Sequence, residues 1–362
     1  MLRRLGRELV KLGSEKEDPP HVDYRWNDPQ TEAEAVRFLA ARLRATLEHD
    51  DSSCAVLIGG DDALGDGVEQ ELSGKHAVHH FKTLDDFLAF REKDSKVCAV
   101  APRSTNARFV HTLAMSLVSN SSTADLPFEY VVVPRKTNEI NDRMWENSND
   151  FLSPLHVDEV DCHKLFQESL ALFEPKTGIR DFLDLAQGLK HVLEREVPGD
   201  TAEFGSFKGQ SGYLHARYLQ ETGSDKRLFM FDTFESFPKE SIGVDYFWSE
   251  THHVRFEEVK EKFSNLPRVT LVKGDFTKTL LDTDCGPLSL AYVDCDSFRG
   301  TKFLIEEIFE KRLSNNGLMI FEDYGHANLL GNRLAVHQAF ERRTDAICFF
   351  SHFSGSYFVW KK

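Results

Sequence analysis

The chain has 362 residues, enough for two ordinary domains that each bury a hydrophobic core. Its 59 acidic residues outnumber 44 Lys and Arg for a net charge of −15, which excludes the basic surface that a nucleic-acid-binding protein needs. Hydrophobic residues make up 41% of the chain, and no apolar run approaches the roughly 20 residues that cross a bilayer, so a membrane-spanning protein is also excluded.

Residues 1–50 are expected to form a helical segment. It opens with a short amphipathic helix over Met1–Gly13, which lacks the apolar core and cleavage site of a secretory signal. The six cysteines are scattered and form no C-x-x-C pair: Cys54, Cys98, Cys162, Cys285, Cys295 and Cys348. Free thiols and a cytoplasmic location are therefore expected.

Residues 51–150 alternate between short apolar runs and helical patterns, which predicts an auxiliary α/β domain of Rossmann-like type. Strands are expected over Cys54–Ile58, Ala77–Phe81, Val97–Ala101 and Tyr130–Val133, with helices over Asp66–Leu72, Leu84–Arg91 and Arg108–Val118. The loop at Gly59-Gly60 lacks the G-x-G-x-x-G spacing of a dinucleotide site, so a structural turn is favoured there. The polar stretch Lys136–Asp150 is interpreted as a linker or a substrate-side loop.

Residues 151–362 carry a second α/β series. Strands are expected over Thr201–Gly205, Arg227–Phe231, Val269–Val272, Leu288–Val293, Leu318–Phe321, Ala346–Phe350 and Tyr357–Trp360, and helices over Ser211–Gln220, Arg255–Phe263, Gly300–Leu313 and Asn332–Arg343. Only Ser351–Ser356 separates the last two strands, which is too short for a parallel crossover, so the sheet must end in an antiparallel hairpin. A doubly wound parallel sheet with an antiparallel last strand is the Rossmann-like architecture of class I S-adenosylmethionine-dependent methyltransferases, although a fold alone does not establish the chemistry.

The first candidate ligand-binding residues lie in the loop between a predicted strand and helix. Gly205 and Gly209 allow a ligand close to the backbone, and the helix beginning near Ser211 offers free N–H groups. Asp232 ends the next strand, where such sheets bind a ribose diol, and Gly274 follows the third strand, where an adenine could lie. The candidate cofactor contacts are Glu203, Gly205, Ser206, Phe207, Gly209, Ser211, Asp232, Thr233, Gly274, Asp275 and Asp294. Ordinary strand-to-helix turns and a solvated strand-end aspartate remain the alternatives.

Four carboxylates follow two predicted strands: Asp294 and Asp296 come after one, Glu322 and Asp323 after the other. The strands are expected to be neighbours, with carboxyl ends that open onto one crevice. Like charges about 4 Å apart repel by roughly 4 kcal/mol at an effective dielectric of 20, so such a cluster either shifts its pKa values or binds a cation. Ligation by oxygen alone favours a hard ion such as Mg²⁺, Ca²⁺ or Mn²⁺. The alternative is that some of these acids cap helices or pair with Arg299 or Arg333.

In order and approximate spacing, these motifs resemble the macrocin O-methyltransferase family, whose members methylate sugar hydroxyls of macrolide and aminocoumarin natural products. The resemblance covers about Glu194 to Arg343. It rests on the run from Glu203-Phe204-Gly205 to Ser211, on Phe231-Asp232-Thr233-Phe234-Glu235-Ser236-Phe237-Pro238, on Asp294-Cys295-Asp296-Ser297-Phe298 with Thr301, and on Glu322-Asp323-Tyr324-Gly325.

The resemblance implies S-adenosylmethionine as cofactor and a divalent metal, usually Mg²⁺, held by Asp294, Glu322 and Asp323. It implies Asp296 as general base, while other members use a nearby histidine, for which His326 is the candidate. Phe298 stands where the family usually has Tyr, which leaves the shape of the acceptor pocket open.

We therefore expect a metal-dependent O-methyltransferase acting on a sugar or glycosylated natural product. A homo-oligomer, dimeric or larger, is also expected from the behaviour of this family. A catechol-type phenol O-methyltransferase and a non-catalytic cofactor-binding or assembly protein are the alternatives, whereas a nicotinamide oxidoreductase would need a glycine fingerprint that both halves lack. The segment Asp245–His253 is interpreted as a lid over the acceptor or as apolar packing, and its His252 and His253 are further candidates for the base.

Overall fold

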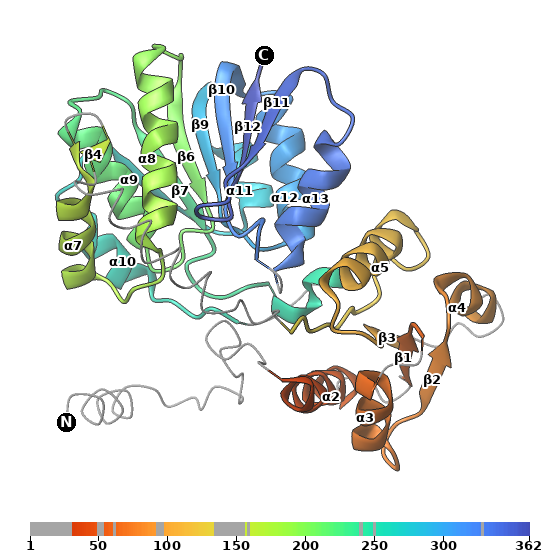
Figure 1. The fold of residues 1–362 in the computed structure, drawn as a ribbon. Helices are drawn as coiled ribbons and strands as arrows, with labels where there is room; N and C mark the ends of the chain where they lie inside the picture. Colours follow the sequence, from red (N-terminus) through yellow and green to blue (C-terminus); the bar gives the residue numbers. More distant parts are fainter. Residues whose placement is uncertain are drawn as a thin grey trace, which may run out of the picture.

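A computed structural model describes residues 31–48, 54–60, 63–91, 98–133, 156–157, 160–238, 242–248, 251–326 and 329–362. The helix expected over Met1–Gly13 and the linker expected over Lys136–Asp150 lie outside the described residues. Figure 1 shows an N-terminal unit, coloured orange, beside a larger C-terminal unit, coloured green to blue. The boundaries predicted between the domains, after residues 50 and 150, stay predictions.

The N-terminal unit is built on a three-stranded parallel sheet in the order β2-β1-β3. Its strands are β1 (Cys54–Ile58), β2 (Val78–Phe81) and β3 (Cys98–Pro102), and its helices are α2 (Glu32–Glu48), α3 (Ala63–Leu72), α4 (Leu84–Arg91) and α5 (Ala107–Ser119). Buried leucines of α2 and α3 pack against Leu57 of β1, so the apolar stripes of both helices cover the sheet. The predicted α/β pattern is confirmed for these elements.

The strand expected over Tyr130–Val133 does not form, and this prediction is wrong. Only Phe128 makes an isolated parallel bridge, to Val100 of β3. The next residues are buried on alternating sides: Tyr130 and Val132 belong to the core shared with the C-terminal unit, while Val131 belongs to the core under α2. The alternation typical of a strand therefore reflects burial between two cores rather than pairing in a sheet.

The C-terminal unit contains a seven-stranded sheet in the order β11-β12-β10-β9-β6-β7-β8. Its strands are β6 (Asp200–Phe204), β7 (Leu228–Asp232), β8 (Val269–Lys273), β9 (Leu288–Val293), β10 (Leu313–Phe321), β11 (Ala346–Phe350) and β12 (Tyr357–Lys361). β12 is antiparallel to both β10 and β11, and the other pairs are parallel. The doubly wound sheet with an antiparallel last strand is thus confirmed. A short hairpin of β4 (His156–Val157) and β5 (Val160–Asp161) precedes it.

Helices cover both faces of this sheet (Figure 1). Alternate residues of β9 enter different cores, Leu290 and Tyr292 on one face and Ala291 and Val293 on the other. The first face is covered by α7 (Cys162–Leu172), α8 (Ile179–Glu194), α9 (Gln210–Glu221) and α10 (Phe256–Lys262), and the second by α11 (Phe276–Asp282), α12 (Phe298–Leu304), η4 (Ile305–Phe309) and α13 (Leu330–Phe340). The sequence pattern had not indicated α7 and α8.

The helix expected over Gly300–Leu313 is too long. It begins as α12, continues as the π-helical turn η4 and ends at Phe309, and Leu313 already pairs with Leu288 of β9. Only the charged residues Glu310, Lys311 and Arg312 lie between η4 and β10, and they include no glycine or proline, so the pattern did not mark the boundary.

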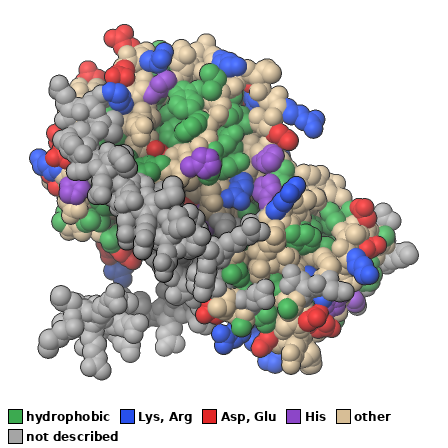
Figure 2. All heavy atoms as spheres, viewed as in Figure 1, with side chains coloured by type: hydrophobic (Ala, Val, Ile, Leu, Met, Phe, Trp, Pro, Cys, Tyr) green, Lys and Arg blue, Asp and Glu red, His purple; other side chains and the backbone are tan. Residues whose placement is uncertain are grey.

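No helix in the described part of the chain combines the length and apolar character that a bilayer crossing requires. In Figure 2 hydrophobic side chains, coloured green, gather over the outer strands β11 and β12, where Ile347 and Phe349 are exposed.

Candidate active site

A cavity of about 680 Å³ opens at the carboxyl ends of β6, β7, β9 and β10. Its volume lies in the range of small-molecule sites, and its position is where doubly wound sheets bind ligands. The predicted site residues that line it are Gly205, Ser206, Phe207, Gly209, Ser211, Asp232, Thr233, Asp275, Asp294, Asp296, Glu322, Asp323 and His326. Glu203 and Gly274 do not reach its surface.

The glycine loop after β6 passes tightly against the end of β9. Gly205 has a φ of +92°, and a Cβ at this position would overlap the carbonyl oxygen of Asp294. Gly209, with a φ of +90°, is the N-cap of α9. Only glycine adopts these conformations without strain, so the loop forms a close wall of backbone at the cavity.

Glu203 lies beneath this loop and is fully buried. Its Oε1 accepts a hydrogen bond from the hydroxyl of Ser211 at 2.9 Å. Burial raises the pKa of Glu203 to about 7. Glu203 is therefore placed to support the loop from below rather than to face the cavity directly.

Asp232 is the last residue of β7, and its carboxylate is hydrogen-bonded to the glycine loop. Its Oδ2 accepts the backbone N–H of Phe207 at 2.8 Å, and its Oδ1 accepts that of Phe234 at 2.6 Å. The hydroxyl of Thr233 also approaches Oδ1, at 3.4 Å, but its single proton is donated to the carbonyl of Ser236 at 2.8 Å. About two of the four acceptor positions of the carboxylate therefore remain for a ligand. The arrangement fits a ribose diol that donates two hydroxyl groups.

The turn after β8 forms another wall of the cavity. Asp275 caps α11, accepting the backbone N–H of Thr277 at 2.9 Å and its hydroxyl at 2.7 Å. Phe276 and Thr277 line the cavity beside it, whereas Gly274 does not. The backbone of the glycine loop, the strand-end carboxylate and the aromatic side chain of Phe276 together form a lining that fits S-adenosylmethionine.

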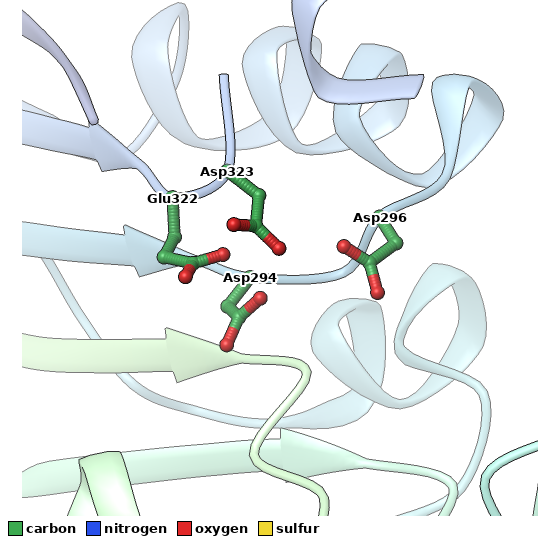
Figure 3. Close-up of side chains that lie close together, drawn as sticks. All are labelled: Asp294, Asp296, Glu322 and Asp323. Carbon is green, nitrogen blue, oxygen red and sulfur yellow. The ribbon is translucent and has the colours of Figure 1, made fainter. Parts of the chain in front are cut away.

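The four predicted acids come together. Each of Asp294, Asp296, Glu322 and Asp323 offers a carboxylate oxygen, and these oxygens all lie within 4.8 Å of one another (Figure 3). The register explains this: Val293 of β9 pairs with Phe321 of β10, so the residues that follow each strand lie side by side.

Two of the acids have strained backbone conformations. Asp296 and Asp323 each have a φ of 54°, in the left-handed region that residues other than glycine rarely adopt. Such conformations cost on the order of 1 kcal/mol or more and persist only where the surroundings hold them. Asp296 is only 2% exposed, so packing around the loop after β9 determines its position.

The acids shift the pKa values of their neighbours. Burial and the charges of Asp294 and Asp323 raise the pKa of Glu322 well above its usual range. Another carboxyl, that of Asp181 on α8, also lines the cavity, and burial and the charge of Asp323 raise its pKa to about 7. No signal in the sequence marks Asp181 as a site residue, because α8 precedes the first strand of the sheet and Asp181 does not follow a strand.

The two arginines considered as ion-pair partners of the four acids, Arg299 and Arg333, contact other groups. Arg299 forms an ion pair with Asp125, and Arg333 donates to the backbone carbonyls of Tyr324 and His326. The oxygen-only donor set therefore fits a hard divalent cation.

The candidate histidines differ in position. His326 lines the cavity, and its backbone N–H donates to the carbonyl of Asp323 at 2.9 Å. The ring of His252 also lines the cavity, packed edge-on against Phe207 and Trp248. His253 is exposed and does not line it. Lining residues outside the predicted site include Lys176, Thr177 and Leu329, and Asp245 from the predicted lid segment lines the cavity as well.

The family described as Macrocin-O-methyltransferase (TylF) matches residues 171–346, which confirms the resemblance seen in the motifs for this C-terminal region. Two curated relatives match about 41% of the chain. An 8-demethyl-8-(2,3-dimethoxy-alpha-L-rhamnosyl)-tetracenomycin-C 4'-O-methyltransferase of Streptomyces olivaceus is 28% identical over 160 residues, and a demethyldecarbamoylnovobiocin O-methyltransferase of Streptomyces niveus is 25% identical over 162 residues. The chain spans 61% of the length of each of these relatives.

Solved structures also align with the chain. The O-methyltransferase NovP is 17% identical, with a TM-score of 0.45 over 71% of this chain and 99% of that protein. The calicheamicin methyltransferase CalS11 is 19% identical, with a TM-score of 0.43 over 63% of this chain and 94% of that protein.

Proposed function

We propose that this protein is an S-adenosylmethionine-dependent and divalent-metal-dependent O-methyltransferase that acts on a hydroxyl of a sugar or glycosylated natural product. The observation that carries the proposal is the cluster of four carboxylates within 4.8 Å, on the wall of a cavity that also contains the glycine loop and Asp232. The family match over residues 171–346 supports the reaction class, and the names of both curated relatives describe O-methyltransferases of natural products.

The cofactor is proposed to lie along the carboxyl ends of β6, β7 and β8. When bound, it supplies an electrophilic methyl group on a sulfonium. The loop from Gly205 to Ser211 would hold its methionine part, Asp232 its ribose, and Asp275 with Phe276 its adenine. By holding the cofactor, these residues would orient its methyl group toward the acids at the end of β9.

Asp294, Glu322 and Asp323 are proposed to hold the metal. A divalent ion would supply charge that orients an acceptor hydroxyl and lowers its pKa. In the proposed reaction Asp296 accepts the proton of the acceptor hydroxyl, since it is buried at the cluster and its carboxylate is close to the three proposed ligands. His326, which lines the same cavity, is the alternative base.

The test is methyl transfer by the purified chain, followed by mass spectrometry. Nucleoside-diphosphate deoxysugars, rhamnosylated glycosides and catechols are offered as acceptors, each with Mg²⁺ and with a chelator. We expect transfer to a sugar hydroxyl that the chelator abolishes. Transfer to catechols alone would contradict the proposed acceptor, and transfer that is unchanged in the chelator would contradict the metal.

Calorimetric titration provides a second test that needs no acceptor. We expect S-adenosylhomocysteine to bind and NAD not to bind, and the reverse result would contradict the proposal. A cytoplasmic location and a dimer or larger oligomer are proposed as well. Fractionation and light scattering check them.

A further inference from the structure

We propose that the N-terminal unit is a working part of the active site, because its residues 124–130 position the two acid-bearing loops of the C-terminal unit. Asp245 and Tyr130 are the positioning residues through which it does so. The inference rests on the proposed function, since it assigns a role in the same reaction to a region outside the family match at residues 171–346.

The first connection is the capping of α12 by Asp245. This carboxylate comes from η3 (Gly243–Trp248) and is only 4% exposed. Its Oδ1 accepts the backbone N–H of Phe298 at 2.6 Å, and its Oδ2 accepts that of Arg299 at 3.0 Å. Both donors lie within three residues of Asp296. Ser297 is the N-cap of α12 and accepts the backbone N–H of Gly300 at 3.0 Å, so Asp245 and Ser297 together hold the start of α12 at the end of the loop after β9.

The second connection ties η3 to the N-terminal unit. The backbone N–H of Gly243 donates to the carbonyl of Asp125 at 3.2 Å, and that of Phe128 donates to the carbonyl of Gly243 at 3.1 Å. Gly243 has a φ of +65°, and a Cβ there would overlap the carbonyl oxygen of Ala124. The carboxylate of Asp125 also pairs with Arg299. The N-terminal unit is thus joined to the start of α12 in two ways: through η3, and directly by the ion pair between Asp125 and Arg299.

The third connection reaches the other acid-bearing loop. The hydroxyl oxygen of Tyr130, which is buried, accepts the backbone N–H of Leu330, the first residue of α13, at 3.2 Å. The next residue, Gly331, lies so close to the loop that a Cβ would overlap the carbonyl oxygen of Asp296. Asn332 donates to the carbonyl of Glu322 at 2.8 Å. Tyr130 therefore supports the turn of α13 that contacts both loops.

These connections matter because the acids need to be held. Asp296 keeps a left-handed backbone, and carboxyl groups gathered this closely would move apart if their loops could relax. Misplacement of a reacting group by about 1 Å can cost on the order of 100-fold in rate. Loss of the positioning contacts is thus expected to lower kcat more than the affinity for the cofactor, which binds along β6 to β8.

The experiment uses three variants of the full chain. Asp245→Asn keeps the size of the side chain, but its amide NH₂ would face a backbone N–H donor. Tyr130→Phe removes only the buried hydroxyl and keeps the ring that stacks on Phe128. Asp225→Asn is the matched control, because Asp225 forms an exposed ion pair with Arg268 away from the cavity.

Two readouts are measured for each variant: hydrogen exchange of the peptide covering residues 294–299, and kcat, acceptor KM and S-adenosylhomocysteine affinity. For Asp245→Asn we expect faster exchange and a kcat at least tenfold lower, with the affinity within about threefold of wild type. Tyr130→Phe should also speed exchange and lower kcat, each by a smaller factor than Asp245→Asn. If Asp245→Asn fails to fold, Tyr130→Phe tests the inference in its place. Asp225→Asn should match wild type.

Wild-type exchange in the folded variants would overturn the inference, as would faster exchange with an unchanged kcat. A wild-type chain that transfers no methyl group would instead refute the proposed function. The exchange readout still tests the positioning contacts in that case.

Discussion

The sharpest prediction concerns the stability of the folded protein in the presence of Mg²⁺. Two unit charges 4.8 Å apart repel by about 3.5 kcal/mol at an effective dielectric of 20. Six pairs among four full charges would total about 20 kcal/mol, more than the roughly 5–15 kcal/mol by which a domain is stable. Without a cation the cluster must therefore hold protons, in agreement with the raised pKa of Glu322.

A divalent cation removes this repulsion only in the folded state, so it should stabilise the protein. At a concentration 100 times its Kd the gain is about 2.7 kcal/mol, which corresponds to a rise in Tm of roughly 5–10 °C for a unit of this size. Scanning calorimetry at pH 8 measures it, with NaCl of equal ionic strength as control.

Glu322→Gln should remove most of this response to Mg²⁺ and should make the metal-free protein more stable at pH 8. The sign follows from the raised pKa of Glu322: stability from its protonated form is fully present below the ordinary pKa of 4.5 and is lost as pH rises through the folded value. Equal melting temperatures in MgCl₂ and NaCl would refute the reasoning, and so would a full response to Mg²⁺ in Glu322→Gln.

Three further predictions concern single residues. Asp296→Asn should lower kcat at least tenfold, with calorimetry showing unchanged affinity for S-adenosylhomocysteine; a fully active variant would mean that the base is elsewhere. Gly205→Ala should destabilise the protein by more than 1 kcal/mol in urea unfolding and weaken cofactor binding, since its Cβ overlaps the carbonyl of Asp294 at a positive φ; wild-type stability would show that the loop can move. Burial raises the pKa of Glu203 from 4.5 to about 7, so stability from its protonated form is present below pH 4.5 and is lost as pH rises through 7, by about 3 kcal/mol. Glu203→Gln cannot titrate and should flatten this pH dependence in urea unfolding of the cofactor-free protein, and an unchanged slope would exclude Glu203 as its source.

Much of the fold was predictable from sequence because its rules are local. Alternation of apolar runs with helical patterns determined the parallel sheet, and the short connection Ser351–Ser356 required the antiparallel hairpin. The acid cluster was predictable for the same reason. Residues that directly follow neighbouring parallel strands must meet at one edge of a sheet, and Asp294 and Glu322 do. The roles assigned to these residues are still predictions.

Only the tertiary structure decided which distant elements meet. Tyr130–Val133 has the alternation of a strand, yet burial between two cores explains it. Asp181 reaches the acids from α8, and Asp245 caps α12 from η3, without any motif to signal it. Local patterns specify which face of an element is apolar, but the partner that covers that face is chosen by packing of the whole chain. The contact between the N-terminal unit and the acid-bearing loops was therefore visible only in three dimensions.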